Sequence, residues 1–357
     1  MQRLKDFLSR KNIVISARRY GIDALGAMAQ GLFCSLLIGT ILRTLGQQTG
    51  SIFLSDIGSY AMAMSGPAMA VAIGYALKAN PLVLFSLVSV GWAANAEGGA
   101  GGPLAVLIIA IAAAECGKAV AGETKIDILV TPAVTVLIGV ALAKLIAPPI
   151  GSAASAFGLM IDRATKLAPF AMGIAVSVLV GIALTLPISS AAICSVLGMT
   201  GLAGGAAVAG CCAQMVGFAC MSFRENGIGG LVSQGLGTSM LQMPNIIKNP
   251  RIWFAPIFVS AVTGPIATCV FGLEMNGAPI NSGMGTCGFC GPIGVVTGWF
   301  SPSAEAVQKG AVAILPSVSD WMGLLLICLI LPALLTPIVA SFLRRIGWIR
   351  DGDLILR

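Results

Sequence analysis

Polar side chains that could bind or transform a small molecule gather in two glycine-rich blocks in the second half of the chain. The first block spans residues 222–245 and the second spans residues 276–294. Carboxylates, amides and hydroxyls hydrogen-bond polar solutes, and a carboxylate can also orient a reacting hydroxyl. The candidates in or beside these blocks are Arg224, Glu225, Asn226, Gln234, Thr238, Ser239, Gln242, Asn245, Glu274, Asn276, Asn281, Ser282 and Thr286.

Each charged candidate also has a purely structural interpretation. Arg224 and Glu225 could form an ion pair at a helix end, and Glu274 could lie in a loop outside a membrane. In the first half, Glu115 and Lys118 are three residues apart, which is one helical turn. An interfacial pair that ends a helix is the simpler interpretation of those two residues.

Several kinds of chemistry are disfavoured by the residue types present. The chain has no histidine, which excludes Ser-His-Asp triads, histidine proton relays and most zinc enzymes. Cys287 and Cys290 have CxxC spacing, but no second pair or histidine accompanies them. No basic residue flanks them to lower a thiol pKa, so a redox role is also disfavoured. We expect no metal and no cofactor.

The composition places these residues in a membrane protein. Of 357 residues, 57% are apolar and 10% are charged, against about 25% charged in a typical soluble domain. The mean hydropathy is +0.95. A soluble protein of this length could not bury so much apolar surface. The apolar runs are continuous rather than alternating, which predicts an all-α polytopic membrane protein.

Uncharged runs long enough to cross a bilayer set the expected spans. A helix of about 20 residues crosses the hydrocarbon, which predicts seven to nine full spans and some shorter segments. Pro148 and Pro149 are expected to end one span, and residues 152–166 to lie at the interface as a joint between two halves. A turn near Pro187 would divide the longest run. The runs are 24–42, 57–77, 79–96, 98–114, 128–143, 167–223, 252–273, 275–304 and 321–343.

The two glycine-rich blocks interrupt this apolar chain. Non-helical backbone is tolerated at membrane depth only where it is buried in protein or lines water. Paired interruptions of this kind are the best sequence indication of a transporter's binding site. The alternative is that both blocks are long loops outside the membrane.

Basic residues at both ends predict the orientation. Residues 1–20 hold six Lys or Arg and one Asp, and they suit an amphipathic segment on the cytoplasmic face. The tail holds Arg344, Arg345, Arg350 and Arg357. We therefore expect a multi-pass membrane protein with both termini in the cytoplasm. The net charge of +7 then reflects these ends and anionic lipid rather than nucleic acid.

Four stretches resemble the membrane subunit IIC of bacterial phosphotransferase systems, in the branch of the perfringolysin regulator-like proteins (EIIC type 2). The Ser-Phe-Arg-Glu-Asn and Gly-Leu-Gly-Thr-Ser-Met-Leu-Gln motifs are the most specific parts, and the resemblance covers nearly the whole chain. The stretches lie at residues 26–46, 124–132, 221–246 and 283–288.

The resemblance implies about ten transmembrane helices in the bacterial cytoplasmic (inner) membrane. An N-terminal bundle at 21–150 would form a homodimer, and a C-terminal bundle at 151–357 would carry re-entrant hairpins near 226–245 and 279–294. A sugar would bind between the hairpins and be phosphorylated by a separate IIB protein. Better-known sugar IIC subunits place a histidine near the sugar, and this chain has none. It also carries no IIA or IIB domain, so the phosphate donor would be another chain.

For a sugar, which offers hydroxyls and an apolar ring face, the chemistry of the candidate residues suggests their roles. Glu225 or Glu274 would orient the acceptor hydroxyl as catalytic groups, since phosphoryl transfer depends on positioning and charge stabilisation. The remaining candidates, from Arg224 to Thr286, would bind the substrate. Two alternatives stay open, which are a membrane sensor or regulator that moves nothing and an ion-coupled secondary transporter.

Overall fold

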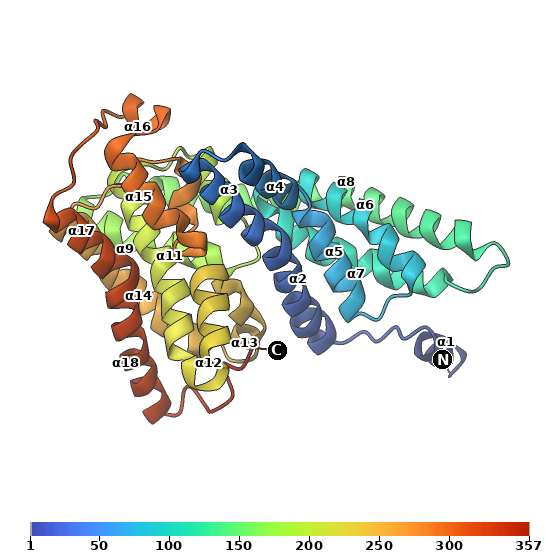
Figure 1. Ribbon diagram of the computed structural model, residues 1–357. Helices are drawn as coiled ribbons and strands as arrows, with labels where there is room; N and C mark the ends of the chain where they lie inside the picture. Colours follow the sequence, from blue (N-terminus) through green and yellow to red (C-terminus); the bar gives the residue numbers. More distant parts are fainter. Residues whose placement is uncertain (1, 357) are drawn as a thin grey trace. The chain divides into compact units, whose positions relative to one another are not determined.

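α-Helices account for most of the computed structural model, which describes residues 2–356 and the side chains from residue 6 onward (Figure 1). No β-strand occurs in this range, where the only β-type pairing is the isolated bridge between Gly201 and Met275. The chain forms two compact units, Met1–Ala154 and Ser155–Arg357. The division falls inside one long helix, α8 (Asp127–Thr165).

The first unit is built from helices of one to several turns that join into longer rods. Residues 19–49 form one helix from η1 to α3, and α4 and α5 form a second that bends by 49°. The elements are α1 (Gln2–Arg10), η1 (Arg19–Asp23), α2 (Ala24–Leu32), η2 (Phe33–Leu37), α3 (Ile38–Thr49), α4 (Ile52–Ala63), α5 (Ser65–Ala76), α6 (Pro81–Gly98), η3 (Gly99–Gly101), α7 (Gly102–Val120) and α8.

Glycines allow close approach between helices of the first unit. A Cβ atom at Gly31 of α2 would overlap the backbone of Ala68 in α5, and Gly66 and Gly91 hold α5 against α6 in the same way. Gly117 near the end of α7 lies against Val83 near the start of α6, so these two helices form an antiparallel hairpin. The chain therefore turns back on itself between α6 and α7.

The second unit surrounds one buried helix, α11, which packs against α9, α14 and α18. Almost every side chain of α11 is buried, and its abundant Gly and Ala residues permit this packing. The elements are α9 (Pro169–Thr185), α10 (Ser190–Val196), α11 (Gly201–Met221), α12 (Phe223–Val232), η4 (Ser233–Gly237), η5 (Ser239–Gln242), α13 (Met243–Lys248), η6 (Pro250–Trp253), α14 (Phe254–Pro265), η7 (Ile266–Val270), η8 (Pro279–Gly283), η9 (Cys287–Phe289), α15 (Cys290–Phe300), α16 (Ala304–Gln308), α17 (Val318–Leu325), η10 (Leu326–Ile330) and α18 (Leu331–Arg345).

Membrane-length helices confirm the all-α polytopic membrane class. Among the described residues, six helical stretches are long and apolar enough to cross a bilayer, and the bent pair α4–α5 is a seventh candidate. Two shorter apolar helices lie at Pro169–Thr185 and Cys287–Phe300. One of the six stretches, Pro81–Val120, comprises the hairpin of α6 and α7, each of which has nearly the length of a span.

One local expectation is wrong. Pro148 and Pro149 do not end a helix, because α8 continues through both to Thr165 and includes the segment expected to be an interfacial joint. The φ angle of proline is compatible with a helix, although its missing N–H removes a hydrogen bond. The turn expected near Pro187 is confirmed, because α9 ends at Thr185 and the short helix α10 leads into the membrane-length helix α11.

Candidate functional site

The two glycine-rich blocks fold as broken helical hairpins that enter the second unit from opposite ends. The first runs through α12 and η4, turns at the extended residue Thr238, and returns through η5 and α13. Asn226, near its start, donates to the carbonyl of Leu354 in the C-terminal tail. The second block begins at the other end, where Ser282 donates to Met199, just before α11. Gly285 then lies against Cys211, halfway along α11.

The tips of the two hairpins touch each other. Thr286 Oγ1 of the second hairpin donates to the carbonyl of Gly235 in the first, at 2.6 Å. Ser239 Oγ lies 2.8 Å from Thr185 Oγ1 at the end of α9. The contact between the tips buries non-helical backbone inside the unit, where only protein groups can satisfy it.

The tip of the second hairpin has an unusual backbone. Gly285, Gly288 and Phe289 have φ angles of +53°, +51° and +58°. A Cβ at Gly285 would overlap Cys211, so this position requires glycine in two respects. For Phe289 the left-handed conformation costs of order 1–3 kcal/mol, a strain that packing around the tip must support.

The candidate amides of the first hairpin bind each other and the chain's own tail. Gln242 donates to Gln234 at 2.9 Å and accepts from Asn245 at 2.8 Å. The carbonyl of Leu354 accepts from Gln242 and Asn226, and that of Ile355 accepts from Asn245. In this conformation residues 354–356 therefore occupy the hydrogen-bonding groups that the sequence suggested for a substrate.

Glu225 pairs with a residue that lies far from it in the sequence. Its Oε1 lies 2.5 Å from Nη2 of Arg344 at the end of α18, and the side chain is 9% exposed. Its Oε2 is buried without a hydrogen-bond partner. Arg344 also pairs with the fully exposed Asp351 at 2.9 Å. Arg224 is exposed and forms no ion pair with Glu225, so the structural pairing considered for these adjacent residues is wrong.

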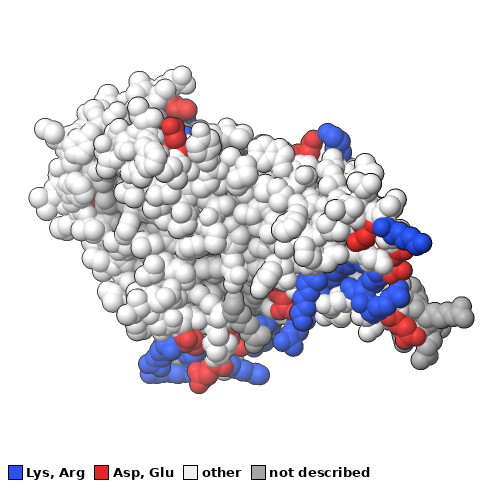
Figure 2. All heavy atoms as spheres, turned by 45° about the vertical axis from the view of Figure 1, so that its right-hand side comes forward, with Lys and Arg blue, Asp and Glu red and all other residues white. Residues whose placement is uncertain are grey.

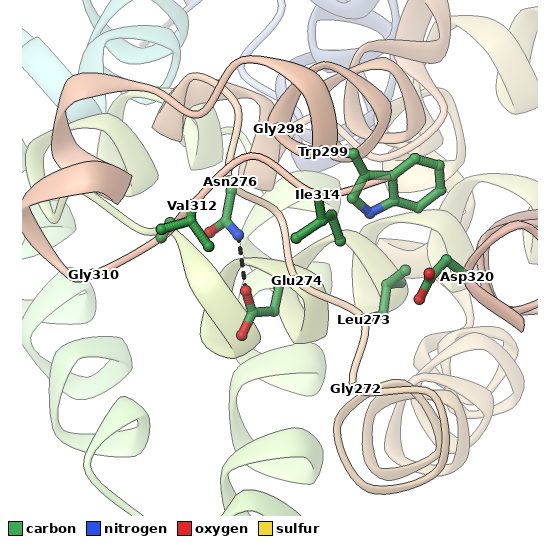
Figure 3. A pocket seen from close by; sticks show the side chains of 11 residues that line it. Gly272, Leu273, Glu274, Asn276, Gly298, Trp299, Gly310, Val312, Ile314 and Asp320 are labelled. Atoms are coloured by element: carbon green, nitrogen blue, oxygen red, sulfur yellow. Dashed lines mark hydrogen bonds between the residues drawn. The ribbon is translucent and has the colours of Figure 1, made fainter. Parts of the chain in front are cut away.

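Glu274 lines a cavity of about 190 Å³ formed by residues 272–276, the end of α15, the loop between α16 and α17, and the start of α17 (Figure 3). Asn276 Nδ2 donates to Glu274 Oε2 at 2.8 Å. Trp299 of α15 and Asp320 of α17 complete the set of side chains able to recognise a solute. Trp299 is itself held edge-on against Trp321, with 5.0 Å between ring centroids.

The structure separates the two candidate carboxylates. Glu225 lies beside the C-terminal tail, whereas Glu274 lies near the start of α11, at the other end of the unit. The two cannot act on one small solute together. Sequence reasoning missed Trp299 and Asp320, although Trp299 stands at the end of the second glycine-rich run. Asn281 lies against Gly294 of α15 and outside the set of residues that line the cavity.

A further polar network lies within the helices. Gln214 of α11 accepts from Trp253 Nε1 at 2.9 Å and from Thr185 Oγ1 at 3.3 Å. Its own amide donates to Ser260 of α14 at 3.4 Å. Hydropathy gave no signal for it, because these polar residues stand singly in apolar helices.

Metal-binding groupings do not occur among the described residues, where no three His, Cys, Asp or Glu side chains lie close enough to hold an ion. Cys287 and Cys290 carry buried thiols. Their environment is that of core side chains of the second hairpin.

Comparison with known protein families gives one match. The family described as "Phosphotransferase system, EIIC" matches residues 22–356, which include both units and both hairpins. Searches of curated proteins and of solved structures found no match to the chain. The family match agrees with the stretches that carried the resemblance in the sequence.

Proposed function

The chain belongs to the phosphotransferase system EIIC family, and on that premise we propose that it binds and translocates a sugar or a related small polar solute. A separate IIB protein would phosphorylate the solute at the cytoplasmic face. The observation that carries this proposal is the contact between Thr286 and Gly235, where two broken hairpins from opposite ends meet inside one helical unit. Discontinuous helices of this kind are the usual setting for a transported solute.

We place the first contact of the solute in the cavity of Glu274. Its carboxylate and that of Asp320 can accept hydrogen bonds from hydroxyls, and Asn276 can also donate. The indole of Trp299 offers an apolar surface for a ring face. At about 190 Å³ the cavity is smaller than the 300–1,000 Å³ typical of drug-sized sites, which restricts it to a small solute.

We assign Glu225 to the ion pair with Arg344 rather than to catalysis. The candidate amides Asn226, Gln234, Gln242 and Asn245 serve the solute only in a conformation in which the tail has left them. Phosphoryl transfer then takes place at the end of the unit that carries Arg344 and the tail, where a IIB protein has access. Solute binding at Glu274 and phosphoryl transfer beside Arg344 thus take place at opposite ends of the second unit.

Uptake into vesicles tests the function. Proteoliposomes containing the protein would be given a panel of radiolabelled hexoses, pentoses and polyols, with and without phosphoenolpyruvate and soluble phosphotransferase components. We expect uptake only with the soluble components, and recovery of a phosphorylated product. Uptake without them would instead indicate a secondary transporter. Binding without uptake under either condition would indicate a sensor or regulator.

The Glu274→Gln variant tests whether the solute binds in this cavity. Losing a charged hydrogen bond costs roughly 1.5–3 kcal/mol, or about one to two decades in affinity. We expect the apparent affinity for the transported solute to fall by that amount. Glu305→Gln is the matched control, because Glu305 is an exposed acid on the neighbouring α16 that lines no part of the cavity. Equal affinities in the two variants would refute the assignment.

A further inference from the structure

A second cavity, of about 410 Å³, lies in the first unit and has a strongly basic lining. It is formed where the end of α1, the turn between α5 and α6, and the end of α7 with its following loop come together. The residues that line it are Arg10, Lys11, Asn12, Lys78, Asn80, Lys118, Ala121, Gly122 and Glu123. Figure 2 shows basic side chains gathered at the lower right of the molecule, on the side where the N-terminal helix lies.

Cationic groups outnumber acidic groups around this cavity. Four Lys or Arg side chains line it, against the single carboxylate of Glu123. Lys11 hydrogen-bonds that carboxylate, which holds the pKa of Glu123 below its usual value and keeps it ionised at neutral pH. Behind the lining, Glu115 is offset by Lys118 and Arg19 lies nearby. Asp127, which accepts from the backbone N–H of the lining residue Gly122, is a further acid beside the cavity. The cationic groups still outnumber the three carboxylates, so the cavity retains a positive potential.

The base of the cavity is rigid. Lys118 is 4% exposed, and its ammonium group donates to the carbonyls of Asn12 and Leu77, at 2.9 and 3.0 Å. It also pairs with Glu115 at 2.8 Å. Arg19 donates to the same two carbonyls. These bonds fix the segment after α1 against the turn between α5 and α6, so the cavity is built before any ligand arrives.

Lys78 and Arg10 are the groups left available to a ligand. Lys78 is exposed, has a φ angle of +55°, and its ammonium group forms no hydrogen bond or ion pair with another described residue. Arg10 is 63% exposed and uses only one terminal nitrogen, Nη2, on Glu123. The conformation of the turn holds the Lys78 backbone in a geometry that non-glycine residues rarely adopt.

We propose that this cavity binds a phosphate-bearing anion, with Lys78 and Arg10 as its ligating groups. Guanidinium and ammonium groups at the edge of apolar helices recognise phosphate by charge-assisted hydrogen bonds. Ile126, Ile128 and Leu129, just beyond the loop of Glu123, are more than half exposed and could contact acyl chains. The phosphate can thus belong to an anionic lipid headgroup or to a free phosphate ion.

Native mass spectrometry and thermal shift together test the proposal. Delipidated protein would be titrated in parallel with phosphatidylglycerol, phosphatidylcholine and inorganic phosphate. Retention of phosphatidylglycerol but not phosphatidylcholine supports the site with a lipid as its source. If inorganic phosphate raises the melting temperature and the two lipids are retained equally, the site is supported as one for free phosphate.

Variants localise the binding. Lys78→Gln and Arg10→Gln should each weaken it about fivefold, as expected for one basic residue facing an anionic surface. Lys144→Gln is the matched control, because Lys144 is an exposed lysine of the same unit that pairs with Glu97 outside the cavity. Unchanged melting temperatures would show that the variants fold. Binding by both cavity variants equal to wild type, or no response to any of the three ligands, would overturn the proposal.

Discussion

Glu225 and Arg344 form an ion pair that joins the first hairpin to the end of α18. We expect Glu225→Gln to lower the free energy of unfolding by about 1–3 kcal/mol. This is less than the 3–5 kcal/mol typical of a broken buried pair, because Arg344 is partly exposed and retains Asp351. Thermal melts in detergent would measure the loss, and solute affinity of the folded fraction should stay unchanged.

Asp351→Asn is the control for that prediction. Asp351 contacts the same guanidinium but is fully exposed, so its removal should change the melting temperature little. A Glu225→Gln protein with normal stability and abolished solute binding would instead support the catalytic role that the sequence suggested.

The sequence showed where polar side chains gather, but it could not show which groups they hydrogen-bond or pair with. The polar density of 222–245 drew attention to amides that the structure brings together, because few polar groups stand in the surrounding apolar chain. Arg344 is 119 residues from Glu225, and the carbonyl of Leu354 is 112 residues from Gln242. Spacing along a sequence reveals pairs one helical turn apart, such as Glu115 and Lys118, and carries no signal for contacts at such separations.

At the scale of elements, the packing of α9 against α11 depends on Gly210. A Cβ at this position would overlap the backbone of Ser177. We expect Gly210→Ala to reduce stability by about 1–3 kcal/mol, the usual cost of overpacking a close contact. The melting temperature of the purified protein would measure the effect.

Gly229→Ala provides the comparison for Gly210→Ala. Gly229 lies in α12, and no neighbouring atom comes within 4 Å of the position that an alanine methyl group would take there. At this position alanine should be neutral or stabilising by up to about 1 kcal/mol, because it restricts the unfolded chain more than glycine does. Equal destabilisation by both changes would show that the close approach of α9 and α11 is not important.

Element boundaries followed from glycine better than from proline. Gly99, with a φ angle of +49°, breaks the chain between α6 and α7 within a run of glycines. Pro148 and Pro149 lie inside α8 because proline stops a helix only where the lost hydrogen bonds are not compensated by surrounding structure. That compensation comes from groups packed around the helix, and the residues next to the prolines in the sequence do not reveal them.

At the scale of the whole molecule, we predict a homodimer formed through the first unit. The helix α4 packs mainly against α3, and its Ile52, Phe53 and Tyr60 are more than 70% exposed. Gly31, a small residue that could allow close approach of a second copy, packs against α5 within the unit instead. Native mass spectrometry in mild detergent should show twice the mass of the 36.3 kDa chain.

Phe53→Ser should shift that equilibrium toward monomer, because it removes a large apolar contact from α4. Phe258→Ser is the matched control, since Phe258 is a 48% exposed phenylalanine of α14 in the second unit. A wild-type protein that appears only as a monomer, or a loss of dimer in the control alone, would contradict the prediction.

The fold class could be predicted from composition, because 57% apolar residues in continuous runs argue against both a soluble protein and a membrane β-barrel, whose strands alternate apolar and polar residues.

The orientation in the membrane rests on charge alone and remains a prediction. Within the second unit, the end with the tail carries exposed Arg224, Arg251, Arg345 and Arg350. The loop between α16 and α17, beside the Glu274 cavity, follows a single Lys309. The positive-inside rule then places the tail in the cytoplasm and the cavity on the outer side.

Two single cysteines decide this orientation. Leu315→Cys lies in the α16–α17 loop at a position 91% exposed, and Asp351→Cys lies in the exposed tail. Both would be made in a background where the exposed Cys34 and Cys269 are replaced by alanine. A membrane-impermeant maleimide added to intact spheroplasts should label Leu315→Cys at once, and Asp351→Cys only after permeabilisation. The reverse pattern would place the Glu274 cavity in the cytoplasm, and a solute arriving from outside could not then meet it first.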